Sequence, residues 1–124
     1  MKAFSDLEQS KKLAEILPIE SADMYWWSSG KRYYIEAMDD GDFNEEEGHV
    51  RAWSLAALIN IIPQELFDGE YIINITEGID NKWIITYDHY ENRNHSFYGL
   101  SAGADNLVDA CYEMIIKLHK LNLL

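Results

Sequence analysis

The feature that most constrains the fold is an apolar stripe on the last helix-forming segment of the chain. From residue 107 to residue 121, apolar side chains recur at spacings of four and three, which places them on one face of an α-helix. The stripe consists of Leu107, Cys111, Met114, Leu118 and Leu121, and it is widened by Val108 and Ile115. Such a face has to be buried, so the chain must supply a second apolar surface for this helix to cover.

Strand patterns before this helix supply that surface. Residues 71–76 and 83–87 are rich in Ile, Tyr and Thr, and the segment Gly78-Ile79-Asp80-Asn81 between them is typical of a turn. Residues 96–98 predict a third, shorter strand after the polar segment 91–94. We therefore expect an antiparallel sheet with one face covered by helices.

Two further helices are predicted in the first half of the chain. Ser5-Asp6-Leu7-Glu8 has the pattern of a capping box, and Pro18 ends the helix that starts there. Residues 53–62 predict a second helix, which Ser54 can cap. Residues 64–67 are expected to add one more helical turn.

Between these two helices, residues 24–27 and 33–37 have the composition of strands, and residues 28–31 predict a hairpin turn. The order is then helix, two strands, helix, two or three strands, helix. It predicts an α+β fold with an antiparallel sheet of about four to five strands and about three helices, packed mainly on one face. At 14.4 kDa a second domain would lack its own core, so residues 1–124 are expected to form one domain.

Charge excludes whole classes of partner. The chain has 22 acidic and 10 basic residues, which gives a formal charge of −12. Nucleic-acid binding needs clustered Lys and Arg, and the nearest approach to a cluster is the pair Lys31-Arg32. We therefore expect no binding to nucleic acid or to anionic membranes. The segment 39–47 carries six carboxylates and no base, and we expect it to be a solvated loop.

The chain shows no apolar segment suited to a signal core or a membrane anchor. Residues 1–8 turn polar at once, and the longest strongly apolar stretch, around residues 55–62, is too short to span a bilayer. The single cysteine, Cys111, excludes an internal disulfide and any multi-cysteine zinc site. Together these features predict a cytoplasmic protein.

Three groups of residues carry a resemblance to known proteins. They are Glu20-Ser21-Ala22-Asp23-Met24, then Ala52-Trp53-Ser54-Leu55-Ala56-Ala57-Leu58 with Ile62-Pro63, and finally Asp105-Asn106-Leu107-Val108-Asp109-Ala110 with Glu113-Met114. In this order, and over most of the chain, they resemble small uncharacterised proteins of phage-like and mobile-element gene clusters in anaerobic gut bacteria. Arg51 departs from that pattern, which has a proline there. The family has no assigned activity, so the resemblance implies an accessory protein of a mobile element and no functional residue.

The spacing of oxygen-bearing side chains in the acidic segment can be compared with that of a calcium-binding loop. Asp40, Asp42 and Asn44 have the alternating oxygen ligands of a calcium loop. The sixth position, which needs a glycine, is Glu45, and the twelfth, which needs a bidentate carboxylate, is Arg51. The pattern therefore favours a solvated loop over a calcium site.

The histidines and the cysteine do not form a recognisable metal-binding or catalytic pattern. The four histidines are scattered at positions 49, 89, 95 and 119. His89 and His95 could face each other across a hairpin, with Asp88 or Glu91 completing a metal site, but surface histidines are the favoured interpretation. Cys111 lies on the apolar stripe, where a free thiol packs as a small hydrophobe. The sequence thus predicts no catalytic residue, no cofactor and no metal.

The aromatic hairpin is the strongest candidate for a binding surface. Tyr25-Trp26-Trp27 and Tyr33-Tyr34 put large rings on both faces of the predicted hairpin. One face must pack on the core, and the other is either covered or exposed to a partner, so both interpretations stay open. If it is exposed, the residues expected to contact a protein are Tyr25, Trp27, Lys31, Arg32 and Tyr34. Trp27→Ala or Tyr34→Ala should then weaken association and leave the fold largely intact.

Three functions follow from these observations. The first is a non-enzymatic protein-interaction module whose partner is another protein or a second copy of the chain. The alternative is an acidic decoy that imitates nucleic acid and occupies the groove of a host protein. The third is an enzyme with an acidic site that no motif announces.

Overall fold

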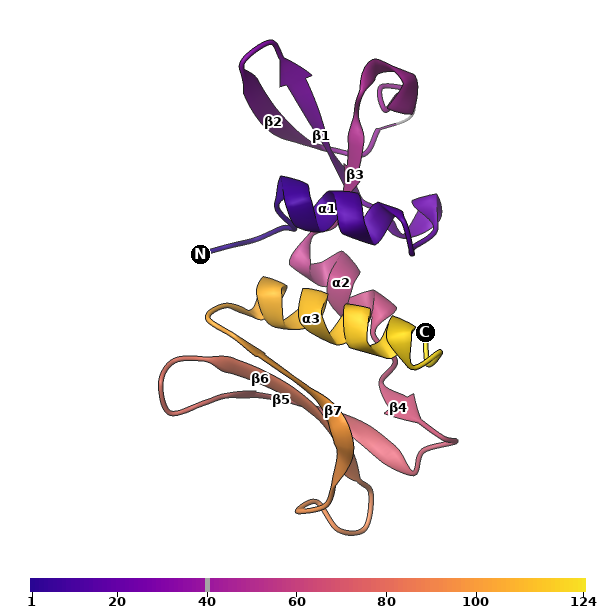
Figure 1. The fold of residues 1–124 in the computed structure, drawn as a ribbon, viewed down its shortest axis with the longest axis vertical. Coiled ribbons are helices and arrows are strands. Elements are labelled where there is room, and N and C mark those ends of the chain that lie inside the picture. Colours follow the sequence, from indigo (N-terminus) through magenta and orange to yellow (C-terminus); the bar gives the residue numbers. More distant parts are fainter. Residues whose placement is uncertain (40) are drawn as a thin grey trace.

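In the part of the chain that the structure describes, three helices lie between two antiparallel sheets, which occupy opposite ends of the long axis of the molecule (Figure 1). This computed structural model describes residues 1–39 and 41–124, so Asp40, the first residue of the calcium pattern, lies outside the described residues. The helices are α1 (Leu7–Ala14), α2 (Leu55–Ile61) and α3 (Leu107–Lys120), and two short 3-10 helices are η1 (Ile19–Ser21) and η2 (Glu45–Glu47). None of the helices in the described ranges combines the length and apolarity needed to cross a membrane.

The first sheet has the strand order β2-β1-β3, and all its pairings are antiparallel. Strands β1 (Met24–Ser29) and β2 (Arg32–Ala37) form the expected hairpin, which projects beyond α1 at one end of the molecule (Figure 1). Its two-residue loop needs a left-handed residue, and Gly30 supplies it with φ of 73°. Strand β3 (Val50–Ala52), which the sequence did not predict, pairs with the other side of β1.

The second sheet has the order β4-β5-β6-β7. Its strands are β4 (Glu65–Leu66), β5 (Tyr71–Glu77), β6 (Trp83–His89) and β7 (Ser96–Ala104). The expected helical turn at residues 64–67 is wrong, because Glu65 and Leu66 pair with β5 instead and the next two residues, Phe67 and Asp68, have left-handed φ values of 54° and 56°. Strand β7 is longer than predicted and contains a register shift opposite the Thr86–Asp88 part of β6.

The predicted α+β class and the three helices are confirmed, but the strands form two sheets where one was expected. Strand β3 runs directly into α2, and α2 lies in the helical layer between the two ends of the molecule (Figure 1). The chain therefore leaves the first sheet before it starts the second. Strands on the two sides of α2 have no edge in common along which to pair.

The main core lies between α3 and the inner face of the second sheet. The buried residues of the α3 stripe, Val108, Cys111, Met114, Ile115 and Leu118, pack in one cluster with Ile85, Tyr87, Leu100 and Ala102 of β6 and β7. The opposite face of this sheet is lined by side chains such as Asn74 and Thr86, and none of the described helices lies on it (Figure 1). The helices thus cover one face, as predicted.

The N-terminal segment is fastened to the start of α2 through a buried serine. The expected capping role of Ser5 is wrong: Asp6 is the N-cap of α1 and forms a capping box with Gln9. Ser5 is fully buried, and its Oγ accepts a hydrogen bond from the backbone N–H of Trp53 at 3.0 Å. Ser54 caps α2 as predicted, since its Oγ accepts from the N–H of Ala57 at 3.2 Å.

Candidate functional site

One face of the hairpin is packed on the rest of the molecule. Directly opposite residues of an antiparallel pair share a face, so Trp26 and its partners Ile35 and Val50 lie together. The indole N–H of Trp26 donates to the carbonyl of Ser5 at 3.1 Å, and the ring of Phe4 meets the Trp26 ring edge-on at 5.6 Å. This face is therefore the one that holds the hairpin to the N-terminal segment.

The other face is covered only at its inner end. The ring of Tyr25 is stacked on His49 at 5.1 Å and meets Phe43 at 5.7 Å, so Tyr25 is only 3% exposed. Its phenol donates a hydrogen bond to a carboxylate oxygen of Glu36 at 3.0 Å. Tyr25 was among the predicted contact residues, but the segment around residues 43–49 folds over it and leaves no surface for a partner.

That covering segment is the acidic loop, and it has more structure than the sequence indicated. The carboxylates that the structure describes in this loop, those of Asp39, Asp42, Glu45, Glu46 and Glu47, are exposed, as expected of a solvated loop. However, Asn44 caps η2 and its backbone N–H donates to Nδ1 of His49 at 3.0 Å. Arg51 reaches back to Glu45, with Nε 2.8 Å from Oε1. The loop therefore acts as a lid on Tyr25 while its acidic side chains face solvent.

Toward the tip of the hairpin the same face is open. Trp27 and Tyr34 are stacked with ring centroids 4.8 Å apart, and Tyr34 is 41% exposed. The indole N–H of Trp27 is shielded from solvent and has no hydrogen-bond partner among the described residues. Lys31 and Arg32 are exposed at the turn beside this pair. Four of the five predicted contact residues are thus brought together at the tip.

The outer edge of β2 is a second open feature of the hairpin. The N–H of Met38 donates to the carbonyl of Asp23 at 2.9 Å, which makes this pair a hydrogen-bonded one in the β1–β2 register. Hydrogen-bonded pairs alternate along an antiparallel ladder, so Tyr33, Ile35 and Ala37 direct their N–H and C=O groups away from β1. These groups have no partner among the described residues, because β1 is the only strand that pairs with β2.

The other sheet edges are less suited to pairing with a further strand. Strands β3 and β4 are only three and two residues long. Strand β7 is longer, but its register is irregular and its Ser101 carbonyl accepts a hydrogen bond from Nζ of Lys117 at 2.5 Å. Short strands, bulges and edge lysines are the devices that keep sheet edges from pairing. The six residues of β2 form the longest regular edge without such a device along its length.

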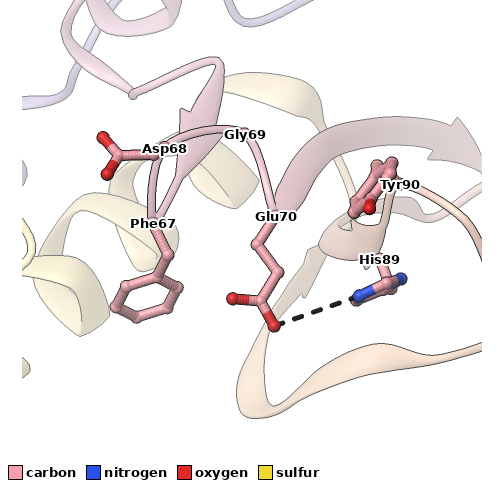
Figure 2. A pocket seen from close by; sticks show the side chains of 6 residues that line it. All are labelled: Phe67, Asp68, Gly69, Glu70, His89 and Tyr90. Carbon is pink, nitrogen blue, oxygen red and sulfur yellow. Dashed lines mark ion pairs between the residues drawn. The ribbon is translucent and has the colours of Figure 1, made fainter.

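A surface hollow of about 480 Å³ lies at the opposite end of the molecule, where the β4–β5 turn approaches the end of β6. Figure 2 shows the Glu70 carboxylate directed at the imidazole of His89, with 3.9 Å between Oε1 and Nε2. The lining residues are Phe67, Asp68, Gly69, Glu70, His89 and Tyr90.

The His89–Glu70 pair is poorly placed for acid–base chemistry. Nδ1 of His89 accepts hydrogen bonds from the backbone N–H groups of Glu91 and Asn92, at 3.2 and 3.4 Å. The proton of the neutral ring therefore belongs on Nε2, which faces Glu70. The two hydrogen bonds to Nδ1 show that this histidine holds the turn that follows β6.

The remaining sequence candidates find structural roles. His89 and His95 do face each other, with ring centroids 6.3 Å apart, but the described residues contain no group of three or more His, Cys, Asp or Glu side chains that could hold a metal ion. The proposed third ligand Asp88 is buried and accepts hydrogen bonds from Asn74, Thr86 and Ser96.

Cys111 is fully buried in the core. Burial raises the pKa of its thiol to about 11, so the reactive thiolate is scarce at neutral pH. This agrees with the interpretation of Cys111 as a packing residue.

Comparisons of the chain with protein-family models, curated proteins and solved structures found no match.

Proposed function

We propose that this protein is a non-enzymatic protein-interaction module that presents its β1–β2 hairpin to another protein chain. The observation that carries the proposal is the outer edge of β2, where Tyr33, Ile35 and Ala37 offer backbone donors and acceptors that no other described residue pairs with. An extended segment that adds to such an edge gains main-chain hydrogen bonds without any change in the host fold.

The side chains around this edge suit the same role. Tyr33 and Tyr34 are 50% and 41% exposed, although a small domain would normally bury such rings. Tyr and Trp are the residues that contribute most to protein interfaces, and Arg, here Arg32, is the third. The hairpin also projects from the body of the molecule, so a partner can approach its edge without meeting the helices (Figure 1).

The wider role follows from the resemblance and the composition. We propose a cytoplasmic accessory protein of a mobile element, because the three groups of residues described above resemble proteins of such gene clusters. A catalytic role has less support, since Cys111 is buried and Nδ1 of His89 accepts hydrogen bonds from the backbone.

An acidic decoy that imitates nucleic acid is the competing proposal, and the contacts that the carboxylates make within the chain argue against it. Several of them already bind groups of this chain, although only Asp88 is buried: Asp6 and Asp109 bind Lys2, Asp23 binds Ser54, Glu45 binds Arg51 and Asp88 binds three polar side chains. A decoy needs carboxylates in rows that imitate phosphates.

Site-specific photo-crosslinking in cells that produce the protein tests the proposal. A benzoylphenylalanine at position 33 should cross-link to a protein, either a second copy or a foreign chain, and Tyr34→Ala should reduce the yield. The matched control is the same probe at position 98, since Tyr98 is 98% exposed but lies on β7 in the other sheet.

Two results would contradict the proposal. One is the absence of any protein cross-link from position 33, and the other is an equal yield from position 98. The decoy would be favoured if a nucleic-acid-binding protein were captured independently of Tyr34 and lost when Glu45, Glu46 and Glu47 are replaced by Gln.

A further inference from the structure

We infer that the chain that pairs with the free edge of β2 is β2 of a second copy, running antiparallel and related by a two-fold axis at Ile35. This inference rests on the proposed function, because it names the partner of the same edge. The pairing would join two three-stranded sheets into one continuous sheet across the dimer.

The outward-facing groups fit this symmetry. Tyr33, Ile35 and Ala37 are the residues of β2 that point away from β1, and they are placed evenly about Ile35. In a two-fold antiparallel pair, Ile35 faces Ile35 of the second copy, and Tyr33 faces Ala37. Each such pair exchanges two hydrogen bonds, so the three pairs form about six. No outward group between Tyr33 and Ala37 is left unpaired.

Charge along the strand selects the antiparallel direction. Lys31 and Arg32 lie at the start of β2, and Glu36 and Asp39 lie at its end, all of them exposed. Antiparallel pairing about Ile35 sets Lys31 beside Asp39 of the second copy and Arg32 diagonal to Glu36. Opposite charges across a strand pair are stabilising, and like charges are destabilising. A parallel, in-register pair would place side chains of the same charge beside each other.

The distribution of net charge favours pairing through this surface. Residues 24–39 contain two basic and two acidic side chains, so the hairpin carries no net charge, and the whole formal charge of −12 resides outside it. Two copies that approach through any strongly acidic surface repel each other. The hairpin is a surface without net charge, on which two such acidic chains can meet with complementary ends.

The experiment measures the monomer–dimer equilibrium of the full chain by sedimentation velocity and light scattering. Ile35→Pro removes the central N–H groups of the proposed pairing but none of the bonds to β1, and proline is tolerated on the outward-facing positions of an edge strand. Ile35→Val is the matched control, since it keeps the N–H and a β-branched side chain. The wild type and Ile35→Val should dimerise, and Ile35→Pro should raise the dissociation constant about tenfold or more.

A charge-swap series tests the register without relying on the fold of the proline variant. Lys31→Glu and Asp39→Lys should each weaken the dimer several-fold, and the double variant Lys31→Glu/Asp39→Lys should restore it. Far-UV circular dichroism establishes that each variant is folded. Restoration by the double variant requires that residues 31 and 39 of different copies lie side by side.

Three results would overturn the inference. They are a wild-type chain that stays monomeric up to about 1 mM, a dimer that persists in folded Ile35→Pro, and a double variant that fails to recover association. A monomer that still cross-links a foreign protein from position 33 would refute self-pairing alone. A monomer that cross-links nothing there would refute the proposed function as well.

Discussion

Replacing Asp109 by Asn is expected to loosen the attachment of the N-terminal segment to α3. Oδ1 of Asp109 accepts hydrogen bonds from Nζ of Lys2 and from Nε2 of Gln9, both at 2.7 Å. Its Oδ2 accepts from Nδ2 of Asn106 at 2.8 Å. Asp109 also lies in the first turn of α3, where a negative charge is stabilised by the helix dipole.

The size of the effect follows from these contacts. An Asn side chain has one oxygen and one NH₂ group, so whichever way it is turned, its NH₂ meets at least one of the three donors. Hydrogen bonds to a charged group contribute about 1.5–3 kcal/mol, and the dipole adds about 0.5 kcal/mol. The side chains of Lys2 and Asp109 remain 25% and 32% exposed, so solvent screens part of this. We expect the free energy of unfolding to fall by about 2 kcal/mol, which lowers Tm by about 8 °C.

The effect should depend on pH in a defined direction. Partial burial alone would raise the pKa of Asp109, but the donors of Lys2, Gln9 and Asn106 outweigh it and hold the pKa below the ordinary value of 3.8. A carboxyl group with a lowered pKa stabilises the fold at pH values above its unfolded pKa, and this contribution is lost as the pH falls through the folded pKa. The difference between wild type and Asp109→Asn should therefore be full at pH 7 and shrink below about pH 4.

Urea unfolding followed by tryptophan fluorescence, at one fixed protein concentration, measures this difference at pH 7 and at about pH 3. Glu113→Gln is the matched control, because Glu113 is exposed on the same helix and no ion pair of it occurs in the described part of the chain. It should change the free energy of unfolding by less than about 0.5 kcal/mol. An Asp109→Asn variant as stable as wild type at pH 7, or equally weakened at both pH values, would refute the reasoning.

Three further predictions concern other buried groups. Trp27→Phe keeps a ring beside Tyr34 and removes an indole N–H that has no partner among the described residues, so chemical denaturation should find this variant at least as stable as wild type. Trp27→Ala should lower the free energy of unfolding by about 2 kcal/mol. A larger loss of stability for the Phe variant than for the Ala variant would contradict this prediction. Ser5→Ala leaves the buried N–H of Trp53 unpaired and should lower the free energy of unfolding by about 1–3 kcal/mol in a thermal melt, and an unchanged melt would show that the contact is not needed. Cys111, whose pKa is raised to about 11 by burial, should react with iodoacetamide at pH 8 only after urea is added, as followed by mass spectrometry; rapid labelling of the folded chain would contradict its burial.

The parts of the fold that the sequence predicted are those that local patterns decide. The stripe of α3 and the turn between β5 and β6 were located correctly, because spacing along the chain determines which side chains share a helix face or flank a turn. The same holds for Ser54, whose hydroxyl caps the helix that starts directly after it. In each case the partners lie within a few residues of each other.

Local sequence patterns did not determine which of two equally suited residues takes a given structural role. Ser5 and Asp6 are both good caps for α1, and Asp6 takes that role because Ser5 is drawn into the core by the backbone N–H of Trp53, 48 positions away. Tyr25 and Tyr34 are both aromatic strand residues on one face of the hairpin, yet only Tyr25 is covered. The difference depends on where the acidic loop folds back, which places Phe43 and His49 over Tyr25.

The candidate site shows the same division. The composition of the hairpin and its turn can be found in the sequence, and they indicated Tyr25, Trp27, Lys31, Arg32 and Tyr34, of which Tyr25 is covered in the structure. That β1 lies between β2 and β3, and that β2 therefore has a free edge, is decided by the pairing of β3 with β1 across more than twenty residues of chain. Strand order depends on which apolar faces the helices cover and which edges remain within reach, and these are properties of the packed molecule rather than of any segment.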